Sequence, residues 1–292
     1  MKILILGSNG QLGRCLRDQF SATNYQVIFS SRSENDVSDL AVTEKYLIAI
    51  NPDIIVNATA YTAVDKAEQD QEAAEQINHL AVANIAKICV DLDCWFVHIS
   101  TDYVFDGLSQ QPYSENHECN PKGVYGATKR RGELAIKRVG CEHLIIRTAW
   151  VFSEYGSNFL KTMLRLGAEK EELSIVGDQI GCPTYAQDIA RVIISLLPLI
   201  ASNKISSGIY NYCGDESCSW FEFAEEIFEQ GVLSGYKVPQ RLRVVNTSDY
   251  PTAAARPHYS VLDCQLIETI PGVSRSNWRL GIKLALQKLP EK

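Results

Sequence analysis

The sequence predicts an α/β fold, a doubly wound parallel sheet of the Rossmann type with a smaller, mixed C-terminal domain. Short apolar runs alternate with amphipathic segments up to about residue 150, as a parallel sheet with helices on both faces requires. A glycine-rich turn follows the first apolar run, and the alternation becomes irregular beyond residue 150. We therefore expect a dinucleotide-binding domain at 1–150, to which a helix near 187–199 returns, and a second domain at 151–292 that would bind the substrate.

The composition is that of a soluble globular protein, since 46% of the 292 residues are hydrophobic and 22% are charged. A formal net charge of −7 argues against a general nucleic-acid-binding protein, which usually has a basic surface. We expect neither a signal peptide nor a membrane span, because the apolar runs are too short for either. The nine cysteines show no C-x-x-C pair or metal-ligand spacing, so we expect reduced thiols and a cytoplasmic location.

The first apolar run, residues 2–6, leads into a turn rich in glycine and then into a helical segment. The turn reads Gly7-Ser8-Asn9-Gly10-Gln11-Leu12-Gly13. A buried strand, a glycine turn and a helix in this order allow backbone N–H groups at the helix start to bind a pyrophosphate. The spacing is G-x-x-G-x-x-G rather than the usual G-x-G-x-x-G. Its place directly after the first strand nevertheless favours nucleotide binding over a purely structural turn.

A second strand at 26–30 ends at the tripeptide Ser31-Arg32-Ser33. An NAD-preferring site usually has an aspartate or glutamate here, which binds the ribose 2′-hydroxyl. Serines and an arginine suit a 2′-phosphate better, so we expect NADPH as the cofactor, with NADH as the alternative. Arg32 could equally be an ordinary surface charge.

The third and fourth strands, at 54–57 and 95–99, end in small or polar residues. The small side chains at 58–62 would leave room for a ligand in the crevice of a doubly wound sheet. A helix over 72–92, predicted by its apolar spacing, would cover one face of the sheet. The fourth strand delivers the polar run 100–103 to the same edge as the glycine turn. Hydroxyls there could bind a substrate oxygen, although a polar strand end is common.

A long loop at 106–124 precedes a helix that carries Tyr125 and Lys129. Residues four apart lie on one helix face. An ammonium beside a phenol favours the phenolate and lowers its pKa from about 10, so the pair could move a proton at neutral pH. The same spacing also occurs on ordinary solvated helices. The functional interpretation therefore depends on the convergence of Thr101 and the glycine turn at this edge of the sheet.

The second part of the chain is less regular. We expect helices near 158–169, 187–199, 219–230 and 276–289, with a strand at 208–211. No repeat or low-complexity linker interrupts it. We interpret this part as a lid that binds the group by which one substrate differs from another.

Several motifs occur together along nearly the whole chain. They are the three glycines of the first turn, the run 100–105, Tyr125-x-x-x-Lys129, the runs 56–68 and 147–152, Asp178-Gln179-x-Gly181-x-Pro183-Thr184, and Arg256-Pro257. In this combination the chain resembles the extended short-chain dehydrogenase/reductases and, more narrowly, the dTDP-4-dehydrorhamnose reductase family.

The resemblance implies an NADPH-dependent reduction of the C4 keto group of dTDP-4-dehydro-L-rhamnose to dTDP-L-rhamnose, for a cell-surface polysaccharide. Tyr125 would protonate the C4 oxygen, Lys129 would hold the nicotinamide ribose, and Thr101 would hydrogen-bond the reacting oxygen. The implied cofactor-binding residues are Gly7, Asn9, Gly10, Gln11, Leu12, Gly13, Arg32, Asp36, Val37, Ala58, Ala60, Tyr61, Tyr125 and Lys129. The implied substrate-binding residues are Thr62, Val64, Thr101, Asp102, Tyr103, Trp150 and Arg256.

The chain departs from this family at a metal site. Some members dimerise around a metal held by glutamates, whereas the matching positions here are Cys15 and Gln187, which are not hard carboxylate ligands. We expect no metal, and a monomer or a homodimer without a metal bridge.

Two other functions compete with the reductase. A sugar-nucleotide dehydratase or epimerase would retain NAD, but the dehydratases have Thr-Asp-Glu where this chain has Thr101-Asp102-Tyr103. A non-catalytic nucleotide-binding regulatory subunit would not need the complete set of Thr101, Tyr125 and Lys129.

Overall fold

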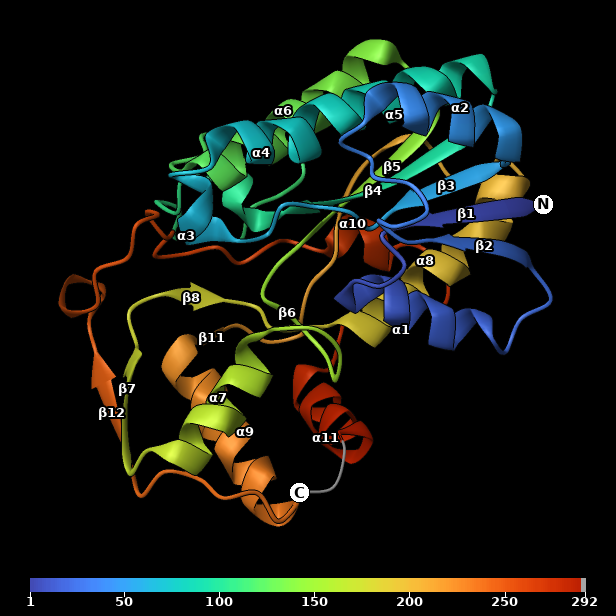
Figure 1. Ribbon diagram of the computed structural model, residues 1–292. Coiled ribbons are helices and arrows are strands. Elements are labelled where there is room, and N and C mark those ends of the chain that lie inside the picture. The colour runs from blue at the N-terminus through green and yellow to red at the C-terminus, as the bar shows by residue number, and fades with distance from the viewer. Residues whose placement is uncertain (290–292) are drawn as a thin grey trace.

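The computed structural model describes residues 1–289, and six parallel strands form the central sheet of that part of the chain (Figure 1). Their spatial order is β2-β1-β3-β4-β5-β10. The strands are β1 (Lys2–Leu6), β2 (Gln26–Ser30), β3 (Ile54–Asn57), β4 (Trp95–Thr101), β5 (His143–Thr148) and β10 (Gly208–Asn211). The chain winds outward in opposite directions from β1 and β3, so the crevice for a ligand opens at the carboxyl ends of these two strands. The predicted α/β class is confirmed.

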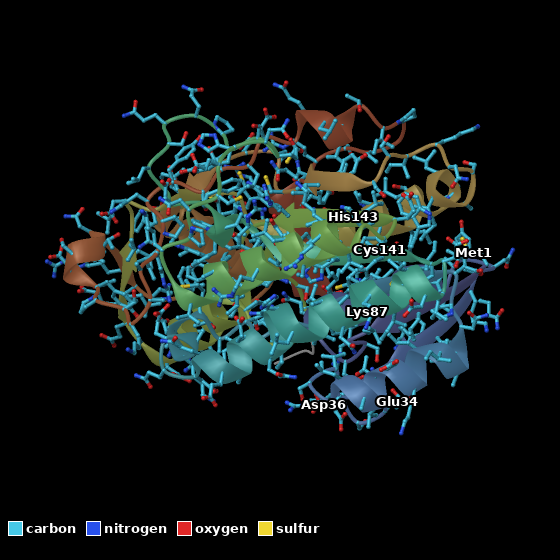
Figure 2. All side chains as sticks on the ribbon, turned by 90° about the horizontal axis from the view of Figure 1, so that it is seen from above. Met1, Glu34, Asp36, Lys87, Cys141 and His143 are labelled. Atoms are coloured by element: carbon cyan, nitrogen blue, oxygen red, sulfur yellow. The ribbon has the colours of Figure 1, made fainter. Side chains whose placement is uncertain are left out.

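Helices cover both faces of the sheet (Figure 1). On one face lie α2 (Leu40–Ile50), α5 (Ala81–Asp91) and α6 (Val124–Val139), which share an apolar core with β1, β3 and β4. On the other face lie α1 (Gln11–Phe20) and α8 (Ala186–Ala201), which pack against each other. Figure 2 looks down onto the first layer. Two independent apolar layers thus hold the strands in register.

A second lobe packs below the sheet (Figure 1). Its own apolar core lies between α7 (Phe159–Glu169), α9 (Trp220–Leu233) and α11 (Trp278–Lys288). Three short strand pairs complete it. They are β7 (Glu172–Val176) with β12 (Arg241–Val245), β6 (Val151–Phe152) with β9 (Thr184–Tyr185), and β8 (Ile180–Gly181) with β11 (Cys218–Ser219).

The later part of the chain returns twice to the first layer. Helix α8 packs on α1, and β10, which the sequence placed in the second part, pairs with β5 at the edge of the large sheet. The division into domains at residue 150 stays a prediction. Over residues 1–289, no helix combines the length and the apolar character needed to cross a membrane.

The helix predicted over 72–92 consists of three segments, α4 (Gln71–Glu75), a π-helical turn (Gln76–Leu80) and α5. Such π turns are rare and often lie at functional sites. Here the turn carries Asn78, whose side chain binds both backbone groups of Tyr61 and the hydroxyl of Thr128 on α6. It fixes the segment after β3 to the helix that carries Tyr125. The remaining short helices are α3 (Val64–Ala67), α10 (Gln265–Glu268) and two 3₁₀ turns, Asp102–Val104 and Thr247–Asp249.

Candidate functional site

A cleft of about 630 Å³ lies at the carboxyl ends of β1, β3 and β4, and residues of the second lobe form its opposite wall. Thirteen of the predicted site residues line it, namely Gly10, Gln11, Leu12, Ala58, Ala60, Thr62, Val64, Thr101, Asp102, Tyr103, Tyr125, Lys129 and Trp150. Eight others do not contribute to the described lining, namely Gly7, Asn9, Gly13, Arg32, Asp36, Val37, Tyr61 and Arg256. The structure thus brings most of the predicted set to one place.

The glycine turn forms one end of this cleft. Gly7 has a φ of +80°, and the N–H groups of Gly7 and Ser8 donate to the carbonyl of Ser30 at the end of β2. A Cβ on Gly13 would lie 2.3 Å from the carbonyl oxygen of Gly7, so α1 can approach β1 this closely only with glycine there. Helix α1 has no side-chain cap within the described chain, which leaves its first N–H groups free beside the cleft. This end of the site fits a dinucleotide pyrophosphate.

Arg32 and Asp36 lie beyond β2, outside the cleft lining. The Arg32 Nε donates to Asp36 Oδ2 at 2.8 Å, and the arginine side chain is 80% exposed. Figure 2 shows Asp36 and Glu34 beside α2, at the margin of the helical layer. Val37, by contrast, is buried. The Arg32–Asp36 ion pair is therefore accessible to a ligand that extends from the glycine turn.

Helix α6 presents Tyr125 and Lys129 to the cleft, as the spacing predicts. Lys129 is buried, and its Nζ donates to the carbonyl of Ile99 at 2.5 Å and lies 3.2 Å from His98 Nε2. Burial lowers the pKa of Lys129 to about 8, and burial raises the pKa of Tyr125 to about 12 against the opposing effect of the nearby Thr101 hydroxyl. The expectation that Lys129 lowers the pKa of Tyr125 is wrong in this structure, because the ammonium is directed to β4.

Thr101 and Asp102 occupy the end of β4. Thr101 caps the following 3₁₀ turn by accepting the N–H of Tyr103 at 3.2 Å, and its hydroxyl donates to Asp102 Oδ1 at 2.9 Å. Asp102 is 2% exposed, and its Oδ2 has no hydrogen-bond partner among residues 1–289. Burial raises the pKa of this carboxyl to about 7. A buried carboxyl group with a free oxygen therefore lies in the wall of the cleft.

Aromatic side chains form the rest of the wall. Tyr103 packs edge-on against Tyr125 with ring centroids 5.5 Å apart, and Trp150 stacks on Trp220 with centroids 3.5 Å apart. A Cβ at Gly181 would lie 2.4 Å from the indole of Trp150, which explains the glycine in that motif. These rings give the second lobe a flat apolar surface over the cleft.

Arg256, a predicted substrate residue, lies near the cleft rather than in its lining. Its Nη2 donates to Asp65 Oδ2 on α3 at 2.7 Å, and its Nε has no partner among the described residues. Its positive charge is close enough to Tyr103 to oppose the rise in the pKa of that phenol, which burial causes.

Sequence reasoning missed other residues of the cleft. Trp220, Gly156 and Ser157 line it, and His98 contacts the Nζ of Lys129. An aromatic cluster at the start of α9 was a usable signal for Trp220. The partner of Lys129 had no signal, since His98 lies in an apolar strand and shares no local pattern with the lysine.

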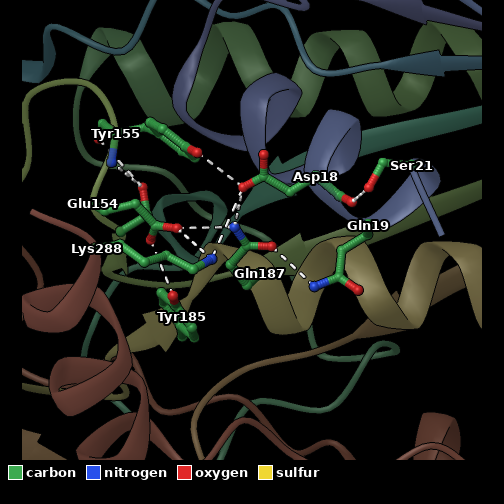
Figure 3. A network of polar contacts seen from close by, with 9 residues as sticks. Asp18, Gln19, Ser21, Glu154, Tyr155, Tyr185, Gln187 and Lys288 are labelled. Atoms are coloured by element: carbon green, nitrogen blue, oxygen red, sulfur yellow. Dashed lines mark hydrogen bonds and ion pairs between the residues drawn. The ribbon is translucent and has the colours of Figure 1, made fainter.

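Gln187 lies in a network of polar contacts between α1, α8 and α11 (Figure 3), and Cys15 is close enough to Glu154 and Asp18 of that network for their charges to contribute to the rise in its pKa, which burial mainly causes. We call this the Glu154 network; its members are Asp18, Glu154, Tyr155, Tyr185, Gln187 and Lys288. The Glu154 carboxylate accepts from Tyr185 at 3.0 Å and from Gln187 and Lys288 at 2.9 Å each. Within residues 1–289, no cluster of His, Cys, Asp and Glu has an arrangement that could hold a metal ion.

A dinucleotide cradle and a Tyr-Lys pair that open into one cleft define a nicotinamide-dependent oxidoreductase of the short-chain dehydrogenase/reductase class. The family model described as the RmlD substrate binding domain matches residues 1–290. The chain belongs to the dTDP-4-dehydrorhamnose reductase family, as the resemblance implied.

Several similar proteins carry the name dTDP-4-dehydrorhamnose reductase. The dTDP-4-dehydrorhamnose reductase of Aggregatibacter actinomycetemcomitans is 38% identical over 287 residues and covers 97% of each chain. The crystal structure of such a reductase from Clostridium acetobutylicum is 36% identical, with a TM-score of 0.90 over 98% of this chain and 99% of the other. That of the Bacillus anthracis enzyme in complex with NADP is 34% identical, with a TM-score of 0.89 over the same shares.

Proposed function

We propose that this chain reduces the C4 keto group of dTDP-4-dehydro-L-rhamnose to dTDP-L-rhamnose with NADPH. The observation that carries the proposal is that Thr101, Tyr125 and Lys129 line the same cleft as the glycine turn. The names of the relatives and the NADP complex of the Bacillus anthracis enzyme support the substrate and the cofactor.

The residues around the glycine turn would hold the cofactor. The uncapped start of α1 supports pyrophosphate binding, and the accessible Arg32 would bind the 2′-phosphate while Asp36 orients it. We therefore expect Arg32→Ala to reduce the preference for NADPH over NADH. Steady-state rates with both cofactors measure that preference, and an unchanged ratio would remove Arg32 from the site.

The chemistry divides between the cofactor and the protein. Bound NADPH supplies the hydride that the C4 carbon accepts. Tyr125 is protonated at neutral pH, because its pKa is about 12, and would donate its proton to the C4 oxygen. The Thr101 hydroxyl would hydrogen-bond the same oxygen, and the Lys129 ammonium would hold the nicotinamide ribose. The contribution of the protein is orientation and a proton.

The substrate would extend from this point toward the second lobe. Thr62, Val64, Tyr103 and the stacked Trp150 would enclose the sugar, since all four line the cleft. Arg256 would bind the diphosphate, because its guanidinium still has a free Nε donor and a planar fork suits phosphate oxygens.

The assembly follows from the same residues. We propose that the protein acts in the cytoplasm as a monomer or as a homodimer without a bridging metal, because Cys15 and Gln187 replace acidic ligands. Lys288 already supplies a cation to Glu154 there.

The decisive experiment mixes the purified protein with NADPH and dTDP-4-dehydro-L-rhamnose. We expect one NADPH to be oxidised for each dTDP-L-rhamnose formed. An epimerase or dehydratase would convert a sugar nucleotide without net loss of NADPH, and a regulatory subunit would show no turnover. Either result in the wild-type protein would refute the reductase.

A further inference from the structure

The first residue of α1, Gln11, makes contacts in both lobes. Its backbone N–H is one of the free groups at the helix start that would bind the cofactor pyrophosphate. Its side chain crosses to the second lobe, where Nε2 donates to the carbonyl of Val151 at 3.2 Å and Oε1 accepts from Asn158 Nδ2 at 2.6 Å. A single residue therefore links the cofactor end of the cleft to the second lobe.

Asn158 organises the loop between β6 and α7 around this contact. Its Nδ2 also donates to the carbonyls of Ser153 at 2.7 Å and Tyr155 at 3.0 Å. Its Oδ1 accepts from the N–H of Lys161 at 3.2 Å and so caps α7. One amide thus shapes the loop, starts the helix and binds Gln11.

The segments on both sides of the Gln11 side chain belong to the wall of the cleft. Gly156 and Ser157 line it, and a Cβ on Gly156 would lie 3.5 Å from the Cβ of Gln11. Val151 also lines it and directly follows Trp150, which belongs to the same wall. The position of Gln11 is therefore tied to that of the wall of the second lobe.

We propose that Asn158 is a positioning residue that couples the binding of the cofactor to that of the sugar nucleotide through Gln11. The identity of the two ligands rests on the proposed function. When the pyrophosphate fixes the N–H of Gln11, the side chain of this residue fixes Val151 and Asn158, and with them the wall against which the sugar binds. Such coupling is reciprocal, so each ligand raises the affinity for the other by the same factor.

Calorimetry with NADPH and dTDP-L-rhamnose measures this coupling factor, because the two cannot react when both are already reduced. We expect NADPH to raise the affinity of the wild type for dTDP-L-rhamnose by about 5- to 150-fold. In Asn158→Ser the factor should fall below about twofold. Serine caps a helix as well as asparagine does, but it lacks the amide that donates to Gln11.

Asn277→Ser is the matched control. Asn277 caps α11 by accepting from the N–H of Leu280 at 2.8 Å, and it lies outside the described cleft lining. The same substitution at this second helix start should leave the coupling factor at its wild-type value.

A second variant removes the contact from the other side. Gln11→Met keeps the length of the side chain and the backbone N–H but loses the donor and the acceptor, so the factor should fall here too. Combined with Asn158→Ser, it should lose no more coupling than either change alone. A merely structural role would weaken the binding of both ligands and leave the factor unchanged. That result, or a wild type without coupling, would overturn the proposal. A wild type that shows coupling but no turnover would count against the proposed function alone.

Discussion

Asp102 and Glu154 are two of the buried carboxyl groups of the described chain, and their surroundings differ in opposite ways. Asp102 accepts one hydrogen bond, from Thr101, and keeps an oxygen without a partner in the described chain. Glu154 is similarly buried but accepts from Tyr185, Gln187 and Lys288. A buried polar group that lacks partners costs free energy of folding, whereas a fully paired one need not. The difference indicates that the cleft is built for chemistry and the Glu154 network for stability.

The largest effect that this comparison predicts is the loss of activity in Tyr125→Phe. The change removes only the hydroxyl, and the ring contact with Tyr103 survives it, so stability should hardly alter. Loss of a general acid usually costs about 10²- to 10⁴-fold in rate. We expect kcat to fall within this range while NADPH affinity stays near wild type, measured by steady-state kinetics and a fluorescence titration. Tyr250→Phe, an exposed tyrosine, is the control, and a rate within a few fold of wild type would exclude Tyr125 as the donor.

Sequence patterns could predict the fold and several cleft residues, because the signals for them lie within short stretches of the chain. An apolar run, a turn or a spacing of four on a helix is set by neighbouring residues, so Gly13, Tyr125 and Lys129 lie where the pattern places them. The direction of the pKa of Tyr125 could not be predicted, since it depends on burial and on where Lys129 turns. The stack of Trp150 on Trp220 joins segments 70 residues apart, and periodicity within either segment contains no information on the other.

The Glu154 network was equally beyond the sequence. Its members come from α1, the loop after β6, β9, α8 and α11, and only the packing of two lobes brings them together (Figure 3). The one hint was negative, namely that neither Cys15 nor Gln187 is a hard carboxylate ligand. The structure shows what surrounds the two carboxylates of this network instead of a metal ion. Asp18 and Glu154 each lie beside the Lys288 ammonium and accept hydrogen bonds from one amide and one phenol.

Glu154→Gln should therefore destabilise the protein rather than inactivate it. The amide loses the charge that attracts Lys288 and keeps one acceptor oxygen for three donors. Removing a charged acceptor from a buried network costs about 2–4 kcal/mol. We expect a loss of this order in the free energy of unfolding by urea, with kcat within about threefold of wild type. Glu169→Gln, which breaks an exposed pair with Arg165, should cost less than about 0.5 kcal/mol. Equal losses in the two variants would contradict a structural role for the network.

The smallest expected effect is the pH dependence of stability, for which Asp102 and Asp106 contribute with opposite signs. The pKa of Asp102 is raised in the folded state, so its contribution to stability is complete below pH 4 and is lost as the pH rises through about 7. Above that pH the folded protein carries a buried charge without a partner for Oδ2. The pKa difference corresponds to at most about 4 kcal/mol. Because a buried amide is itself imperfectly bonded, we expect Asp102→Asn to stabilise the protein by about 1–2 kcal/mol at pH 8 and hardly at pH 4.

We expect Asp106→Asn to change the free energy of unfolding in the opposite direction under the same conditions. The N–H of Leu108 lowers the pKa of Asp106, so its contribution is present above the ordinary value and is lost in acid. The asparagine variant should therefore be less stable than wild type at pH 8, and the gap should close toward pH 3. Urea unfolding at both pH values measures the two differences. If Asp102→Asn also lost stability at pH 8, its carboxylate would be satisfied in the folded protein, and the proposed contrast with Glu154 would fail. If Asp102→Asn gained stability at pH 8, the cleft would retain an unpaired acid at the expense of stability.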